Sequence, residues 1–546
     1  MGDENANRGG EPSRKRPREG SREPYGPKGG SGDTTELHGA LPPSVPHETS
    51  EERVEELGPK APAIQRGVSK WGPWKRWSWY REIRQHERDE PSIWGKHDPD
   101  ENARGRLPDD EDVQVPAIWV AELYTPSTVG GLLDGIRHLG WEHGRSRDNS
   151  LTKWMNDVRE GRKAGWTSLG LVSPPGEAQL MKERTAPLPY GAKVALPILM
   201  SLTPSLTAFV VVFLLDDNAA ASLGTPLRAE FMTTTRRDPL FRSWHIIRYV
   251  LRNGAVRFGR RIFDPDITRR EAVRSCLRNL ESHCVAWVHE HLPGAFSSLG
   301  GARNPTAALL VTEQVRPLSE EARAIRALSG LAIDRYYDAW ESDEWPGARL
   351  VLPRGWDDEG SRLVFSCRRR DAFPDRPGYH DPTSNWTIAQ RADDLVRGLL
   401  SRWALTCLLD SYHEALSTLR DQTALNSRYR PVRDLKTLRS LTRTTLYDIG
   451  ACSQEIAAFA ESDRLYRHDV LEMVYVSEVR GKKRELLVGL KSSQVQRARQ
   501  VQREAELLRL TLSTSNDLSQ TISNIRIQRL VVWLTLISIG IAFWLS

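Results

Sequence analysis

The stretch between residues 490 and 539 constrains the fold more than any other part of the chain. It contains neither proline nor glycine, so no residue in it breaks a helix. Its apolar positions recur at steps of three and four residues, as in a heptad repeat. The seam consists of Ala498, Val501, Ala505, Leu508 and Leu512, followed by Ser515, Ser519 and Ile522. We expect one long stalk helix whose seam meets neighbouring helices, so that the protein forms a homo-oligomer.

The stalk leads into an uncharged segment, residues 530–546. A helix of this length covers ~26 Å at ~1.5 Å per residue, the lower limit for crossing a bilayer. Tryptophans stand near both ends of the segment, as indoles do at membrane interfaces, and two arginines precede it. We therefore expect a single transmembrane anchor with the lipid bilayer as its partner. The expected anchor residues are Leu530, Trp533, Leu534, Ile537, Ile541 and Trp544, and the juxtamembrane basic residues are Arg526 and Arg529.

Charge is distributed unevenly along the chain. The whole sequence has 77 basic and 71 acidic side chains, and its net charge of +6 is too small to indicate nucleic-acid binding. The excess lies in the stalk between residues 480 and 529, and basic residues beside a span stay on the cytoplasmic side. No apolar leader follows Met1. The expected location is the membrane, in a single pass with the N-terminal bulk in the cytoplasm. The alternative is a C-terminal helix buried inside a soluble oligomer.

Composition divides the rest of the chain into four regions. Residues 1–65 combine glycine, proline, serine and mixed charge, which predicts a disordered tail. Residues 66–112 begin with tryptophans interleaved with lysine and arginine, a Trp-rich basic arm that we expect to pack on the following domain. Stacking on nucleic-acid bases is the less favoured interpretation of this arm, and a membrane interface is another. Residues 113–380 have the pattern of an α/β or α+β domain, and residues 384–529 that of a helical bundle and stalk.

Within residues 113–380, β-branched apolar runs predict buried strands. The expected strands are residues 118–124, 167–172, 208–215, 307–312, 349–352 and 362–367. The clearest helix is expected to start after Asp266 as its N-cap and to end at Pro293. Residues 194–215 are uncharged over 22 positions, but prolines interrupt them, so two strands joined by a turn are favoured over a second span. Further helices are expected from Ser384 and after Pro431.

No catalytic, cofactor-binding or metal-binding motif stands out from the sequence. Phosphate-binding loops, dinucleotide-binding glycine patterns, nucleophile elbows and HExxH helices do not occur. The densest group of metal-ligand residues is His283, Cys284, His289 and His291, but on one helix these side chains point in different directions. The five cysteines are dispersed, which is typical of free thiols in a reducing compartment. Any cofactor therefore remains unknown at this stage.

The order of these parts resembles the CorA family of magnesium channels. The resemblance is carried by the residues from Asn524 to Arg529 before Leu534 and Thr535, which look like that family's junction between stalk and membrane. That family follows its first span with a Gly-Met-Asn loop and a second span, and no Gly-Met-Asn occurs in this sequence. The resemblance therefore implies the scaffold, a symmetric oligomer of long helices, and not magnesium conduction.

Three functions are consistent with this organisation. The first is a C-terminally membrane-anchored scaffold or sensor protein, oligomeric, with an unknown ligand. The second is a divergent CorA-like channel or another pore-forming membrane protein. The third is an enzyme whose active site lies in the α/β domain without a recognisable motif, which a cleft with convergent carboxylates or with the residues from His283 to His291 would support.

Overall fold

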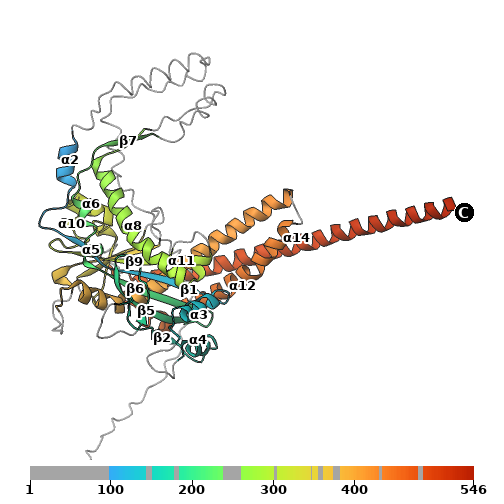
Figure 1. Cartoon of the computed structure of the whole chain (residues 1–546), viewed down its shortest axis with the longest axis horizontal. Helices are drawn as coiled ribbons and strands as arrows, with labels where there is room; N and C mark the ends of the chain where they lie inside the picture. Colours follow the sequence, from blue (N-terminus) through green and yellow to red (C-terminus); the bar gives the residue numbers. More distant parts are fainter. Residues whose placement is uncertain are drawn as a thin grey trace, which may run out of the picture. The chain divides into compact units, whose positions relative to one another are not determined.

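The structure is a computed structural model of the chain (Figure 1). It describes residues 97–142, 150–176, 184–237, 260–299, 304–345, 347–353, 361–372, 381–429, 433–476 and 484–545. These residues belong to one compact unit, Ser78–Ser546. The predicted tail and the tryptophans of the predicted basic arm lie outside the described residues.

A mixed sheet forms the centre of this unit. The described residues give it 11 strands in the order β13-β10-β11-β12-β9-β1-β6-β5-β3-β4, with β2 paired to β5. Most neighbours are antiparallel, whereas β9 and β12 run parallel, as do β3 and β4. The strands are β1 (Val113–Tyr124), β2 (Gly165–Ser168), β3 (Val172–Ser173), β4 (Arg184–Thr185), β5 (Ala192–Thr203), β6 (Leu206–Leu215), β9 (Thr306–Thr312), β10 (Ala339–Glu341), β11 (Ala348–Val351), β12 (Arg362–Arg368) and β13 (Val474–Tyr475). A separate two-stranded sheet pairs β7 (Thr234–Arg237) with β8 (Arg260–Phe263).

The longest uncharged run inside the body, residues 194–215, forms a hairpin in this sheet. Strands β5 and β6 pair antiparallel along most of their length, and the chain turns at Pro204 and Ser205. Both faces of β6 are buried, which explains why its sequence is continuously apolar rather than alternating. The prediction of two strands is confirmed, and the alternative of a second membrane span is wrong.

Helices cover both faces of the sheet. On one face, α11 packs against β1, β6 and β9, α12 packs against β5, and α14 packs on α11 and α12. Helices α3, α4 and α8 pack on the other face. Domains of this type bury each apolar face of a sheet under a helical layer. The helices are α2 (Asp98–Gly105), α3 (Val129–His138), α4 (Leu151–Arg159), α5 (Asp217–Ala220), α6 (Gly224–Arg228), α8 (Pro265–His291), α9 (Ala295–Ser298), α10 (Glu320–Ala324), α11 (Asn385–Tyr429), α12 (Arg433–Glu461), α13 (Asp463–Arg467) and α14 (Leu486–Leu545), with 3-10 turns η5 (Arg326–Leu331), η6 (Tyr336–Asp338) and η7 (Arg369–Asp371).

Helix α8 begins two residues earlier than the sequence predicts. Its N-cap is Asp264, whose carboxylate accepts a hydrogen bond from the backbone N–H of Ile267 at 2.7 Å. Pro265 takes the first helical position, where its missing N–H costs nothing. Asp266 instead lies inside the first turn and pairs with Arg269 and Arg270.

Helix α14 is one continuous helix of 60 residues, as the sequence predicts (Figure 1). Its first part packs on α11 and α12, and the seam residues Ala498, Val501, Ala505 and Leu508 are buried there. The predicted heptad seam is real, but as far as Leu508 its partner helices come from the same chain.

The expected transmembrane anchor is wrong. In the part of the chain that the structure describes, no helix is long and apolar enough to cross a membrane. Gln528 and Arg529 end the apolar stretch of α14 on its N-terminal side. The mixed α/β body therefore stands, and the predicted terminal span and single-pass membrane location are withdrawn.

Candidate functional site

The residues predicted to form the anchor lie on the distal segment of α14, which we define as residues 509–539. Leu530, Trp533, Leu534 and Ile537 are 52–67% exposed, and Arg529 is exposed beside them. The side chains of Arg526, Ile541 and Trp544 are outside the described residues. The described members of the predicted set thus share one exposed surface.

Apolar side chains surround the last part of the distal segment, from Leu530, on every side. Leu530, Val531 and Val532 are consecutive, so they point in directions about 100° apart around the helix. The exposed apolar residues of the segment are Leu510, Ile525, Ile527, Leu530, Val531, Val532, Trp533, Leu534, Ile537 and Ile539. A helix that is apolar all round is normally buried on all sides, and contiguous exposed apolar surface of this kind marks an interaction site.

A buried glutamine fixes the first part of α14 to the body. Gln494 is fully buried, and its amide nitrogen donates to the carbonyl of Arg402 at 2.7 Å and to the hydroxyl of Thr406 at 2.9 Å. Its amide oxygen accepts a hydrogen bond from the Tyr466 hydroxyl at 2.9 Å. These bonds tie α14 to α11 and α13 and set the register from which the distal segment extends.

The arginine beside this glutamine holds the end of α13. The buried guanidinium of Arg402 donates to the backbone carbonyls of Leu465, Tyr466 and His468 at 3.0–3.2 Å. Burial lowers the pKa of Arg402 to about 10. A cation at the C-terminal end of a helix satisfies carbonyls that have no partner in the helix itself.

A buried carboxylate, Glu122, lies near the C-terminal end of β1. Burial raises the pKa of Glu122 to about 7, against the opposing effect of N–H donors from Phe296, Leu123 and Ser297. The nearest of these donors, Phe296 N–H, lies 2.9 Å from Oε1. The side chain thus accepts hydrogen bonds from the first turn of α9.

A histidine completes the surroundings of this carboxylate. Asn304 donates to Glu122 Oε2 at 3.4 Å, and the Asn304 amide oxygen accepts a hydrogen bond from His289 Nε2 at 2.6 Å. The distance between His289 Nε2 and Glu122 Oε2 is 3.8 Å. The cluster joins α8, α9 and β1, but it lines neither of the two hollows described below. Its hydrogen bonds hold these elements together.

The described surface includes two hollows lined by basic residues. One lies along α14 and is lined by residues that include Asp463, Lys491, Arg499 and Arg503. In it, Lys491 pairs with Asp463 at 2.9 Å, and Arg499 pairs with Glu461 at 2.7 Å. The charges of this groove are therefore largely matched within the chain.

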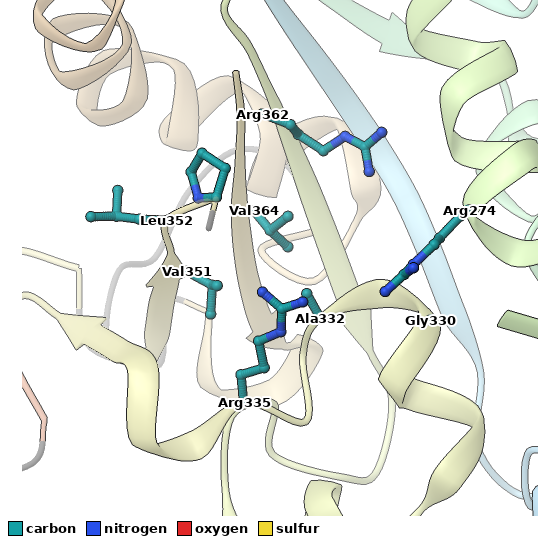
Figure 2. A pocket seen from close by; sticks show the side chains of 9 residues that line it. Arg274, Gly330, Ala332, Arg335, Val351, Leu352, Arg362 and Val364 are labelled. Atoms are coloured by element: carbon teal, nitrogen blue, oxygen red, sulfur yellow. The ribbon is translucent and has the colours of Figure 1, made fainter. Parts of the chain in front are cut away.

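The second hollow, which we call the arginine hollow, lies between α8, the segment after η5 and the strands β11 and β12. Figure 2 shows Arg274, Arg335 and Arg362 entering it from three different elements. Its floor includes Val351 and Val364, a directly opposed pair on β11 and β12. The lining is completed by Gly330, Ala332, Leu352 and Pro353.

The metal-ligand residues singled out in the sequence do not converge. Cys284 is buried in the core, where burial raises the pKa of its thiol, and His283 packs edge-on to Tyr190. His291 stacks on Trp287. Among the residues that the structure describes, no group of three or more His, Cys, Asp or Glu side chains could hold a metal ion.

No family model matches the chain, and no curated protein matches it. The resemblance to the CorA family therefore stays a prediction.

Proposed function

We propose that the protein is a self-assembling scaffold in which the distal segment of α14 joins copies of the same chain. The observation that supports this most strongly is the exposed apolar surface around residues 525–539, on a helix whose first part is anchored in the body by Gln494. A scaffold needs a rigid connection between its folded body and its assembly element. Helix α14 provides the connection in its first part and the assembly element in its distal segment.

Other copies of this chain are the occupant that the sequence of α14 favours. The heptad pattern that fills the intramolecular seam up to Leu508 continues in the sequence through Leu512 to Ile522, beyond the last buried position. Only four charged residues, Arg509, Asp517, Arg526 and Arg529, occur in the distal segment. Repulsion between copies is therefore small relative to the apolar area available for burial.

The all-round pattern also constrains stoichiometry. One partner helix covers only one side of a helix, so a helix with apolar residues on every side requires at least two partners. The proposed assembly therefore contains three or more copies.

The test is the mass of the full chain in solution without detergent, measured by analytical ultracentrifugation. The wild type is expected at three or more times 61.8 kDa. A triple variant, Leu530→Gln, Leu534→Gln and Ile537→Gln, removes three exposed apolar side chains along one ridge of the helix and is expected to shift to the monomer. The matched control is Tyr447→Gln, Leu465→Gln and Val488→Gln, which changes three exposed apolar side chains of the body.

A monomeric wild type contradicts the proposal, and so does an oligomer that the distal triple variant leaves intact. If a monomeric wild type instead binds to lipid vesicles, or is recovered only with a different protein, the distal segment binds lipid or that protein. Either result also contradicts the proposal.

A further inference from the structure

The arginine hollow lies in the body, apart from the assembly helix, and its lining is one-sided in charge. Of the nine lining residues, three are arginines and none is acidic. They come from different elements: Arg274 from α8, Arg335 from the turn before η6, and Arg362 from the start of β12. Guanidinium groups repel one another, so gathering three of them around one space has a cost that an anion in that space would offset.

The carboxylates near the hollow do not balance these charges. Arg362 pairs with the buried Glu281 at 2.5 Å. Asp334 lies near Arg335 and Arg274, which favour its charged form while burial raises its pKa. Arg270 also lies near Asp334, but it pairs with Asp266. The three arginines of the lining therefore stand against two carboxylates, Glu281 and Asp334.

The Arg274 side chain has the clearest capacity to bind a ligand. Within the described part of the chain, no hydrogen bond or ion pair is formed by its guanidinium, although the side chain is half-buried and lines the hollow. Arg335 and Arg362 have further partners in the chain, which hold them in place. A half-buried guanidinium without such a partner retains all five of its N–H donors for an anion.

The wall of the hollow at the end of η5 includes a residue in an unfavourable backbone conformation. Ala332 lines the hollow with φ at 61°, in the left-handed region that residues other than glycine seldom adopt. Gly330 beside it packs closely on α8, where an added Cβ would stand 3.3 Å from Val273 and from the Arg270 Cα. The wall is therefore held tightly in place, as walls of ligand sites often are.

The hollow is small. Its volume is about 350 Å³ with the open mouth included. A carboxylate has two acceptor oxygens and is satisfied by one bidentate arginine, whereas a terminal phosphoryl group offers three oxygens to donors from several directions. Three arginines on three sides therefore fit a phosphoryl group better than a carboxylate.

We propose that the arginine hollow binds a phosphoryl group, supplied either by inorganic phosphate or by a small phosphate monoester. This makes the body a ligand-binding module, independent of whether α14 assembles.

The experiment is calorimetric titration of the full chain with inorganic phosphate, phenyl phosphate and acetate at constant ionic strength. The wild type is expected to bind both phosphates saturably and acetate at least ten-fold more weakly. Phenyl phosphate binding more tightly than phosphate identifies a monoester as the source, and the reverse order identifies free phosphate. Arg274→Gln and Arg335→Gln are each expected to weaken phosphate binding about 10- to 100-fold, since charge-assisted hydrogen bonds are lost.

The control is Arg420→Gln, which removes one positive charge at an exposed position of α11 outside the hollow. Equal weakening in this control shows non-specific attraction and overturns the proposal, as does acetate binding equal to phosphate or no saturable phosphate binding by the wild type. Arg362 is not substituted, because its loss leaves Glu281 buried without this partner. Protection against thermal unfolding by phosphate, present in the wild type and in Arg420→Gln but lost in Arg274→Gln, gives a second readout.

Discussion

The body and the distal segment of α14 place side chains in opposite environments. The body encloses groups that water would solvate well, among them Glu122, Arg402 and Gln494, and gives them hydrogen-bond partners. The distal segment exposes leucine, valine, isoleucine and tryptophan. Buried polar groups are tolerated when they form hydrogen bonds. A large apolar surface left exposed on one chain usually marks a site where a partner binds. The body therefore buries its apolar side chains within one chain, whereas the described side chains of the distal segment remain exposed and, in the proposed assembly, are covered by other copies.

The largest effect is expected at Arg402. Arg402→Ala leaves the carbonyls of Leu465, Tyr466 and His468 without their donor and creates a cavity, which should lower the free energy of unfolding by about 4 kcal/mol. Urea denaturation of the full chain measures it. Arg420→Ala, an exposed position on the same helix, should change it by less than about 0.5 kcal/mol. If the two variants lose similar amounts of unfolding free energy, the hydrogen bonds of Arg402 do not contribute measurably to stability.

The pH dependence of stability tests the environment of Glu122. Its pKa is about 7 in the folded chain, against an ordinary value of 4.5 that we take for the unfolded chain. As the pH rises, the unfolded chain therefore loses this proton at a lower pH than the folded chain does. The contribution of this group to stability is present below pH 4.5 and is lost as the pH rises to about 7. The full loss is about 3 kcal/mol.

The measurement is urea denaturation between pH 4.5 and 8, compared with Glu122→Gln, which cannot ionise. The free energy of unfolding of the wild type minus that of Glu122→Gln should fall as the pH rises across that interval. Asp393, whose pKa burial raises to about 6, is unchanged in the variant and cancels in the difference. A difference that is flat or that rises with pH would show that Glu122 is ionised in the folded protein throughout.

A smaller effect is expected within α14 itself. Gln494→Ala removes three hydrogen bonds in a buried site and should destabilise the body by about 2 kcal/mol. Gln500→Ala, on an exposed turn where the amide only reaches Glu504, should have an effect within about 0.5 kcal/mol. Thermal unfolding compares them. If the two substitutions are equivalent, α14 is not fixed to the body at Gln494.

The central strands could be predicted from sequence because their residues are apolar on both faces. The predicted runs at 118–124, 208–215, 307–312 and 362–367 fall within β1, β6, β9 and β12. Burial on both faces leaves a local signal, which needs no knowledge of the partner strand. The two-residue strand β13 has no such signal, because its pairing with β10 depends on the turns around it.

The candidate sites depended on long-range contacts and could not be predicted in the same way. Glu122 interrupts an apolar strand, which was a usable signal, but its partners Phe296 and Asn304 lie more than 170 residues away. The arginine hollow likewise joins four separate segments. The heptad seam showed that α14 would pack along one stripe, but periodicity alone does not distinguish a partner in the same chain from one in another.

The junction at β13 has a mechanical consequence. Val474 and Tyr475 extend the edge of the sheet at β10, and directly afterwards the chain returns to start α14, with Leu486 N–H donating to the Met473 carbonyl at 2.9 Å and Tyr475 N–H to the Arg484 carbonyl at 3.0 Å. A force applied to an assembled α14 therefore enters the body partly through this short ladder of backbone hydrogen bonds. Such a ladder shares load among its bonds when sheared and releases them singly when peeled, so the direction of pull decides how firmly each body is held.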